Sequence, residues 1–150
     1  MRQNELIEQM AALAEGVTYD MSNLANASAL LYGSLEEINW AGFYLLRDQE
    51  LVLGPFQGKP ACTNIALGRG VCGSAAKENR TLRIENVHRF AGHIACDAAS
   101  NSEIVIPIRK NGGVWGVLDI DSPKIGRFDE EDQNMLESFV RKLEMILGFE

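Results

Sequence analysis

The sequence lacks the features that would assign it to a membrane, to nucleic acid or to secretion. No apolar run approaches the roughly 20 residues of a membrane-spanning helix, and the first residues, MRQNELIEQM, hold no apolar signal-peptide core. Basic residues are in the minority, because 14 Lys and Arg stand against 21 Asp and Glu, for a net charge of −7. Such a charge repels phosphate backbones and anionic lipid. We therefore expect a soluble, cytoplasmic protein that binds neither nucleic acid nor membrane.

Cysteine is scarce, and its count is odd. Cys62, Cys72 and Cys96 cannot all pair as a disulfide framework, and no two of them have the Cys-x2-Cys spacing of a structural zinc site. His88 and His93 complete no standard ligand pattern with them, so we expect no metal and no cofactor. From composition alone, buried packing and thiol chemistry are equal alternatives for the three cysteines.

The patterning predicts one α+β domain over residues 1–150. A chain of 150 residues with 46% hydrophobic and 23% charged residues has the composition of a single globular domain, and it has no internal repeat. Helices are predicted over residues 6–31 (one, or two hinged near Gly16), over 70–79, and after an N-cap at Asp129. Strands are predicted over 37–46, 51–53, 81–85, 103–108 and 114–121, with loops over 54–64 and 86–102. Because regular βαβ alternation is absent, we expect a mostly antiparallel central sheet with the N- and C-terminal helices packed on one side.

The last two predicted strands form a hairpin whose register follows from burial. A three-residue loop at 111–113 would pair Lys110 with Val114 and set Ile106 opposite Leu118. Both apolar sets then share one face, whereas a slip of one residue would send every partner to the wrong face. We therefore predict the three-residue loop.

This register gathers acidic residues on the other face of the hairpin. Glu103 falls opposite Asp121, and Val105 falls opposite Asp119. Carboxylates held this close either bind a cation or force one member to keep its proton, and a protonated member can act as a general acid. A solvated acidic face is the alternative.

Two further motifs carry open alternatives. Trp40 and Tyr44 share one face of the first predicted strand with Gly42 between them, which predicts either a core ridge or a gap for a small apolar or cationic group. Cys72 lies near the start of the helix predicted over 70–79, where the helix dipole lowers a thiol pKa, so its position favours it as the nucleophile. Cys96, in the loop over 86–102, is the competing candidate.

The GRGVCG stretch at 68–73 matches a dinucleotide-binding fingerprint. Residues 65–85 are too few for the full βαβ unit that this fingerprint needs, so we reject nucleotide binding.

Four stretches together resemble the free methionine-(R)-sulfoxide reductases, a branch of the GAF fold. They are NWAGFYLL at 39–46, GPFQGKPACTNIALGRGVCG at 54–73, HIACDAASNSEIVIPI at 93–108 and GVLDIDSP at 116–123. The resemblance covers nearly the whole chain. By this resemblance Cys96 is the catalytic cysteine, Cys62 the recycling cysteine and Cys72 a third one available for disulfide exchange. The resemblance therefore overrules the positional preference for Cys72 as nucleophile.

The same resemblance assigns the substrate site and the reaction. It implies that Glu103, Asp119 and Asp121 are acidic residues of the substrate site. It also implies that Trp40 and Tyr44 form an aromatic wall around the substrate methyl group. The expected reaction is reduction of free L-methionine (R)-sulfoxide to L-methionine, with Glu103 as the proton donor. It passes through a sulfenic acid and an intramolecular disulfide that thioredoxin recycles. The resemblance also implies a homodimer with a role in oxidative stress.

Two other functions remain as alternatives. A non-catalytic GAF module that binds a small ligand as a sensor would share the fold. A thiol peroxidase would account for the cysteines but for neither the acidic cluster nor the aromatic pair.

Overall fold

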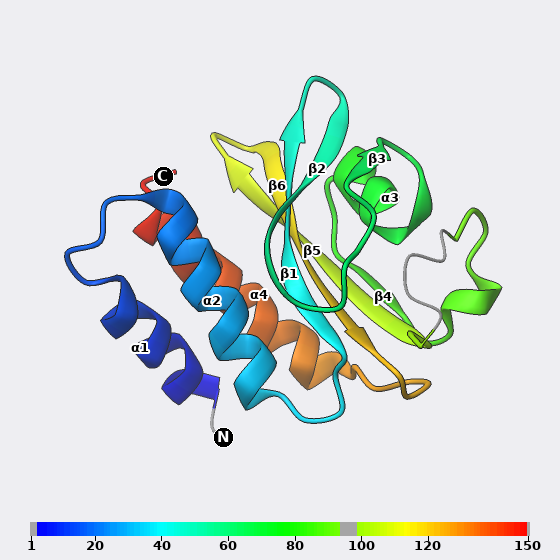
Figure 1. The fold of residues 1–150 in the computed structure, drawn as a ribbon, viewed down its shortest axis with the longest axis horizontal. Coiled ribbons are helices and arrows are strands. Elements are labelled where there is room, and N and C mark those ends of the chain that lie inside the picture. The colour runs from blue at the N-terminus through cyan, green and yellow to red at the C-terminus, as the bar shows by residue number, and fades with distance from the viewer. Residues whose placement is uncertain (1–2, 94–98, 150) are drawn as a thin grey trace.

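A curled antiparallel sheet forms the centre of the molecule (Figure 1). The computed structural model describes residues 3–93 and 99–149, and these contain six strands in the order β3-β2-β1-β6-β5-β4. The strands are β1 (Trp40–Arg47), β2 (Glu50–Gly58), β3 (Asn64–Ala66), β4 (Leu82–Ile84), β5 (Ser102–Lys110) and β6 (Gly113–Ser122). The helices are α1 (Gln3–Ala14), α2 (Asp20–Ser34), α3 (Gly70–Glu78) and α4 (Glu130–Ile146), with a short 3₁₀ turn, η1 (Val87–Arg89), after β4.

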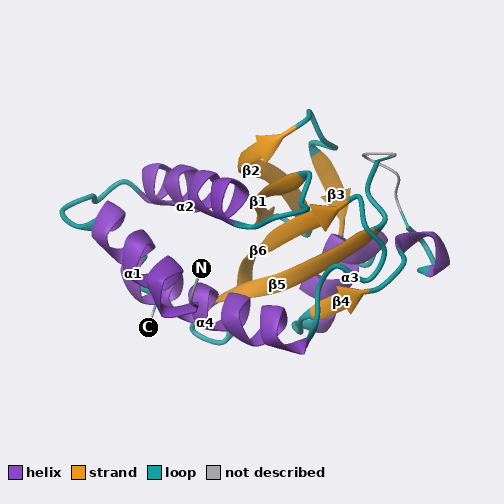
Figure 2. Cartoon of the chain, turned by 90° about the horizontal axis from the view of Figure 1, so that it is seen from below, coloured by secondary structure: helices purple, strands orange, loops and turns teal. Residues whose placement is uncertain are grey.

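Helices cover both faces of the sheet (Figure 2). On one face, Phe43 of β1 and Leu118 of β6 pack in a core with Leu24 of α2 and Phe139 of α4, and α1 adds to the same layer. On the opposite face, α3 packs over a second apolar cluster through residues such as Val71. The α+β class, the mostly antiparallel sheet and the N- and C-terminal helices on one side are thus confirmed.

The N-terminal stripe forms two helices, the second of the two predicted alternatives. Gly16 has a φ of +75°, a conformation that side chains other than glycine rarely adopt, and it lies between α1 and α2. The N-cap predicted at Asp129 is also confirmed, because its side chain accepts a hydrogen bond from the Asp132 amide at the start of α4. The strand predicted from residue 37 begins only at Trp40, since Glu37 has a φ of +56°.

The loop predicted over residues 54–64 is wrong in its first half, because β2 continues to Gly58. Gly42 pairs with Phe56 and Tyr44 pairs with Leu53, so the two residues between them on β2 face a single residue on β1. This β-bulge accommodates Pro55, which has no N–H to contribute to a regular ladder. The proline signal that argued against a strand therefore marks a bulge within one.

The hairpin register is confirmed, but the predicted three-residue loop is wrong. Lys110 pairs with Gly113 across a two-residue turn in which Asn111 and Gly112 both have positive φ, at 54° and 82°. A register shift beside Ile108 then leaves one extra residue on β6, which restores the even register farther along the strands. Glu103 accordingly pairs with Asp121, as predicted.

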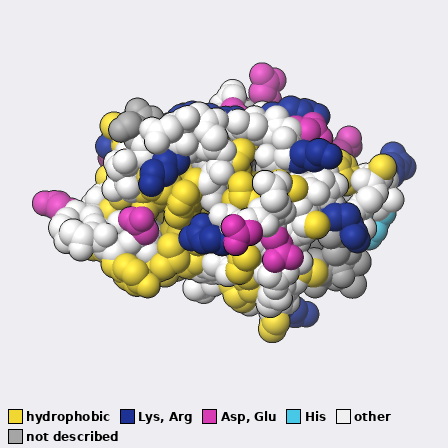
Figure 3. All heavy atoms as spheres, turned by 90° about the horizontal axis from the view of Figure 1, so that it is seen from above, with side chains coloured by type: hydrophobic (Ala, Val, Ile, Leu, Met, Phe, Trp, Pro, Cys, Tyr) yellow, Lys and Arg dark blue, Asp and Glu magenta, His cyan; other side chains and the backbone are white. Residues whose placement is uncertain are grey.

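On the face seen in Figure 3, acidic and basic side chains lie interspersed rather than in one patch. In the described part of the chain, no helix is both long enough and apolar enough to cross a bilayer.

Candidate active site

A pocket opens on the α3 side of the sheet, between that helix and strands β1, β5 and β6. It brings together six of the predicted site residues: Trp40, Tyr44, Cys72, Glu103, Asp119 and Asp121. Its remaining lining consists of Pro60, Ala61, Ile65, Arg69, Gly70, Val71, His93 and Ser100. The three acids predicted to share one face of the hairpin do so, and the aromatic pair lines the same pocket.

The acidic cluster comes from two paired strands. Asp119 and Asp121 alternate along β6, and β5 supplies Glu103 beside them. Asp119 is only 5% exposed, and its Oδ1 has no hydrogen-bond partner among the described residues. Burial raises the pKa of both Glu103 and Asp119 well above the usual range, and the negative charge of the neighbouring aspartate adds to the shift in each case. The cluster therefore keeps a proton to a higher pH than isolated, solvated carboxyl groups would.

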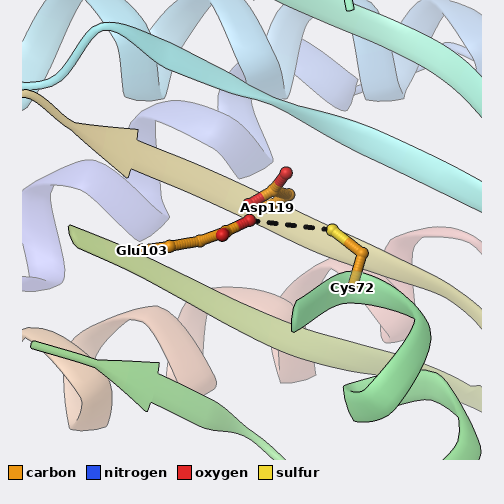
Figure 4. Close-up of side chains that lie close together, drawn as sticks. All are labelled: Cys72, Glu103 and Asp119. Atoms are coloured by element: carbon orange, nitrogen blue, oxygen red, sulfur yellow. Dashed lines mark hydrogen bonds between the residues drawn. The ribbon is translucent and has the colours of Figure 1, made fainter. Parts of the chain in front are cut away.

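Cys72 lies beside this cluster, in the first turn of α3 (Figure 4). Its thiol donates a hydrogen bond to Oε2 of Glu103, with a sulfur-to-oxygen distance of 3.9 Å. The side chain is buried, and burial, followed by the charges of Asp119, Glu103 and Asp121, raises its pKa well above the usual range. The expectation that the helix dipole lowers the pKa of Cys72 is wrong, because desolvation and three nearby carboxylates outweigh half a charge at a helix end.

The aromatic pair holds the loop that carries Cys62. The rings of Trp40 and Tyr44 stack with their centroids 5.9 Å apart. The indole N–H of Trp40 donates to the carbonyl of Lys59 at 3.1 Å, and the hydroxyl of Tyr44 donates to the carbonyl of Cys62 at 2.9 Å. The aromatic wall thus fixes the backbone of residues 59–62 against the pocket.

The gap that Gly42 was predicted to leave between these rings is closed. A Cβ at this position would lie 2.8 Å from Cα of Phe56 and 2.9 Å from Cη2 of Trp40. The glycine is required by the close approach of β2, and the pocket lies beside the aromatic pair rather than between its rings.

The cysteines differ in state. Cys62 is disulfide-bonded, whereas Cys72 is a free thiol. Cys96, the expected nucleophile, falls within 94–98 and so lies outside the described residues. Of the two histidines, His93 lines the pocket, and burial and then the charge of His88 lower its pKa. His88 instead hydrogen-bonds Asn101 at 2.8 Å.

Sequence reasoning did not identify Ser100 as part of the pocket. Its hydroxyl accepts a hydrogen bond from the amide of Asn39 at 3.2 Å, which ties the end of the loop to the strand β1 side. Ser100 lies in a loop without hydrophobic periodicity, so the only sequence signal for it is its place in the HIACDAASNSEIVIPI stretch.

Comparison with known proteins identifies the class. The model of the GAF domain family matches residues 5–147, so the chain is a GAF-domain protein. Within this class, the chain is 57% identical over 144 residues to the free methionine-R-sulfoxide reductase of Escherichia coli. The aligned region covers 96% of this chain and 87% of that protein. The chain belongs to the family of free methionine-R-sulfoxide reductases.

Solved structures agree with this assignment. The reduced form of fRMsr from Staphylococcus aureus superposes with a TM-score of 0.94 at 51% identity, over 97% of this chain and 95% of that one. The free methionine-R-sulfoxide reductase from Neisseria meningitidis, in complex with its substrate, has a TM-score of 0.93 at 40% identity, over 97% of this chain and 88% of that one.

Proposed function

We propose that this chain reduces free L-methionine (R)-sulfoxide to L-methionine, with Cys96 as the nucleophile and Cys62 as the resolving thiol. The observation that carries the proposal is the cluster of Glu103, Asp119 and Asp121 in one pocket with an aromatic wall, beside a disulfide-bonded Cys62. The named activity of the Escherichia coli relative supports it. A sensor module has no need of a disulfide at its ligand pocket.

Substrate binding uses opposite chemistry on two sides of the pocket. The sulfoxide methyl group packs against Trp40 and Tyr44, whose rings are buried and stacked. The ammonium group of the free amino acid lies against Asp119 and Asp121, since a cation relieves the repulsion between buried carboxylates. A peptide-bound methionine has no such ammonium group, which accounts for a preference for the free amino acid.

The first chemical step combines thiolate attack with protonation. The Cys96 thiolate attacks the sulfoxide sulfur while Glu103, whose raised pKa keeps it protonated, gives its proton to the sulfoxide oxygen. The sulfur–oxygen bond breaks and the oxygen passes to the cysteine sulfur as a hydroxyl, while the sulfur–sulfur bond formed in the attack breaks with its electron pair on the methionine sulfur, so that methionine leaves. The sulfoxide is reduced by two electrons, and Cys96 is oxidised to a sulfenic acid.

A second thiol then closes the cycle. The Cys62 thiol attacks the sulfenic acid, water leaves, and a Cys62–Cys96 disulfide forms. The disulfide-bonded state of Cys62 supports this pairing, as does the free thiol of Cys72 in the same molecule. Thioredoxin reduces the disulfide by thiol–disulfide exchange, and Cys72 is a third cysteine available for that exchange. We further propose a cytoplasmic homodimer that acts against oxidative stress.

Single-turnover assays of cysteine variants test the assignment. Cys96→Ser abolishes methionine formation, whereas Cys62→Ser releases one equivalent of methionine and then fails to recycle with thioredoxin. Methionine formation by Cys96→Ser would refute the nucleophile, and normal recycling by Cys62→Ser would transfer the resolving role to Cys72. Saturable binding of the sulfoxide by the wild-type chain without its consumption would favour the sensor function.

A carboxamide variant tests the proton donor. Glu103→Gln keeps the shape of the side chain but has no acidic proton, so the single-turnover rate falls by roughly 10²–10⁴-fold. Glu78→Gln, at an exposed position on α3, is the matched control and leaves the rate unchanged. An unchanged rate for Glu103→Gln would exclude Glu103 as the donor.

A further inference from the structure

We propose that Cys72, Glu103 and Asp119 form a binding site for a thiophilic divalent cation, with Zn²⁺ as the representative ion. A bound cation would also exclude methionine sulfoxide from the pocket; this exclusion rests on the proposed function, whereas cation binding does not. From the sequence we predicted no metal, because the cysteines and histidines have no standard ligand spacing.

The geometry of the three side chains suits a small cation. One ligand atom from each residue lies within 4.8 Å of the others, and the three come from α3, β5 and β6 (Figure 4). Zinc binds thiolate sulfur at about 2.3 Å and carboxylate oxygen at about 2.0–2.2 Å, so ligands of a tetrahedral site lie roughly 3.3–3.8 Å apart. The 3.9 Å between Sγ of Cys72 and Oε2 of Glu103 is close to that value. A small rotation of the side chains brings all three to bonding distance.

A second and independent observation points to a ligand. Oδ1 of Asp119 is buried, lines the pocket and has no hydrogen-bond partner among the described residues, while the residue as a whole is 5% exposed. A buried carboxylate oxygen without a donor is unfavourable unless a bound species supplies the missing interaction. A cation between Asp119 and Cys72 supplies it.

The charge of the site also lacks compensation from the protein. Among the described residues, neither Glu103 nor Asp119 forms an ion pair with Lys or Arg. Two carboxylates and one thiolate match a dication with one negative charge in excess. The sulfur ligand selects zinc-like ions, because Mg²⁺ and Ca²⁺ prefer oxygen ligands alone.

The cation site does not depend on the redox pair. Cys72 is a free thiol while Cys62 is disulfide-bonded, so the three ligands are available in the oxidised protein. The metal takes Asp119, the same residue that we propose for the substrate ammonium. Metal and substrate therefore compete.

A thiolate–metal absorption band tests the binding. The double variant Cys62→Ser/Cys96→Ser retains Cys72 as its single thiol, so a charge-transfer band on addition of Co²⁺ can arise only from that residue. We expect the band to saturate at one equivalent per chain and Zn²⁺ to abolish it. Asp119→Asn in this background weakens Co²⁺ binding by at least about tenfold, the loss that even an outer-shell partner of a metal ligand produces. Glu78→Gln leaves it unchanged.

The wild-type protein provides a second measurement if the double variant does not fold. The oxidised wild-type protein competes with a chromogenic chelator for Zn²⁺ and withholds one equivalent of the ion per chain. Cys72→Ala removes this competition. The proposal is overturned if no band appears with equimolar Co²⁺, or if Asp119→Asn binds the ion as tightly as its parent. Methionine sulfoxide then displaces Co²⁺ from the double variant; binding without displacement would refute the competition alone.

Discussion

Removing the hydroxyl of Tyr44 tests whether the aromatic wall holds the loop that carries Cys62. The phenol is buried at 2% exposure and donates to the carbonyl of Cys62 at 2.9 Å. Its pKa lies far above the usual range, mainly because of burial, so it remains a donor at any working pH. Tyr44→Phe keeps the ring and its stacking on Trp40 but leaves that carbonyl without its donor.

The magnitude follows from one hydrogen bond. Its loss costs about 1 kcal/mol, which for a domain of this size lowers Tm by about 3 °C. Under the proposed mechanism, the freed loop also slows closure of the Cys62 disulfide, while the single-turnover release of methionine keeps its rate. Scanning calorimetry gives the first quantity, and quenched-flow thiol counting separates the other two.

The matched control is Tyr19→Phe, whose side chain is 66% exposed, and it leaves both quantities unchanged. A Tyr44→Phe protein with the wild-type Tm and the wild-type rate of disulfide closure would refute the anchoring role.

Two further changes have outcomes set by packing and by pH. Gly42→Ala places a methyl group within 2.8 Å of the β2 backbone, so it lowers the free energy of unfolding by at least about 1–3 kcal/mol. The control Gly33→Ala has open space around the added methyl group and raises the free energy of unfolding. Urea titrations measure both values. Asp129→Ala removes the capping hydrogen bond to the amide of Asp132 and lowers Tm at pH 7, and Glu130→Ala does not. The pKa of Asp129 is lowered in the folded protein, so its contribution to stability is present above the unfolded pKa of about 4. That contribution is lost as the pH falls through the folded pKa, and the Tm values of variant and wild type therefore converge in acid. A constant difference in Tm down to acidic pH would contradict the capping role.

Much of the fold was predictable because its signals are local. Alternation along β5 and β6 places Glu103 opposite Asp121 from the sequence alone, since the side-chain period of a strand is two residues. The turn itself was mispredicted, because a β-bulge lets a two-residue turn reach the same register as a three-residue one. Pro55 was misread for a similar reason, as only the neighbouring strand reveals a bulge.

Most of the helices and strands, the acidic face of the hairpin and, through a resemblance, the family could be predicted from the sequence alone. Tertiary structure decided what those residues experience. Cys72 is 31 residues from Glu103 in the chain, yet its thiol donates to that carboxylate, and its pKa rises where its position at a helix end predicted a fall. The pKa of a group depends on desolvation and charge repulsion from every element that packs around it, and a local sequence pattern does not show which elements those are.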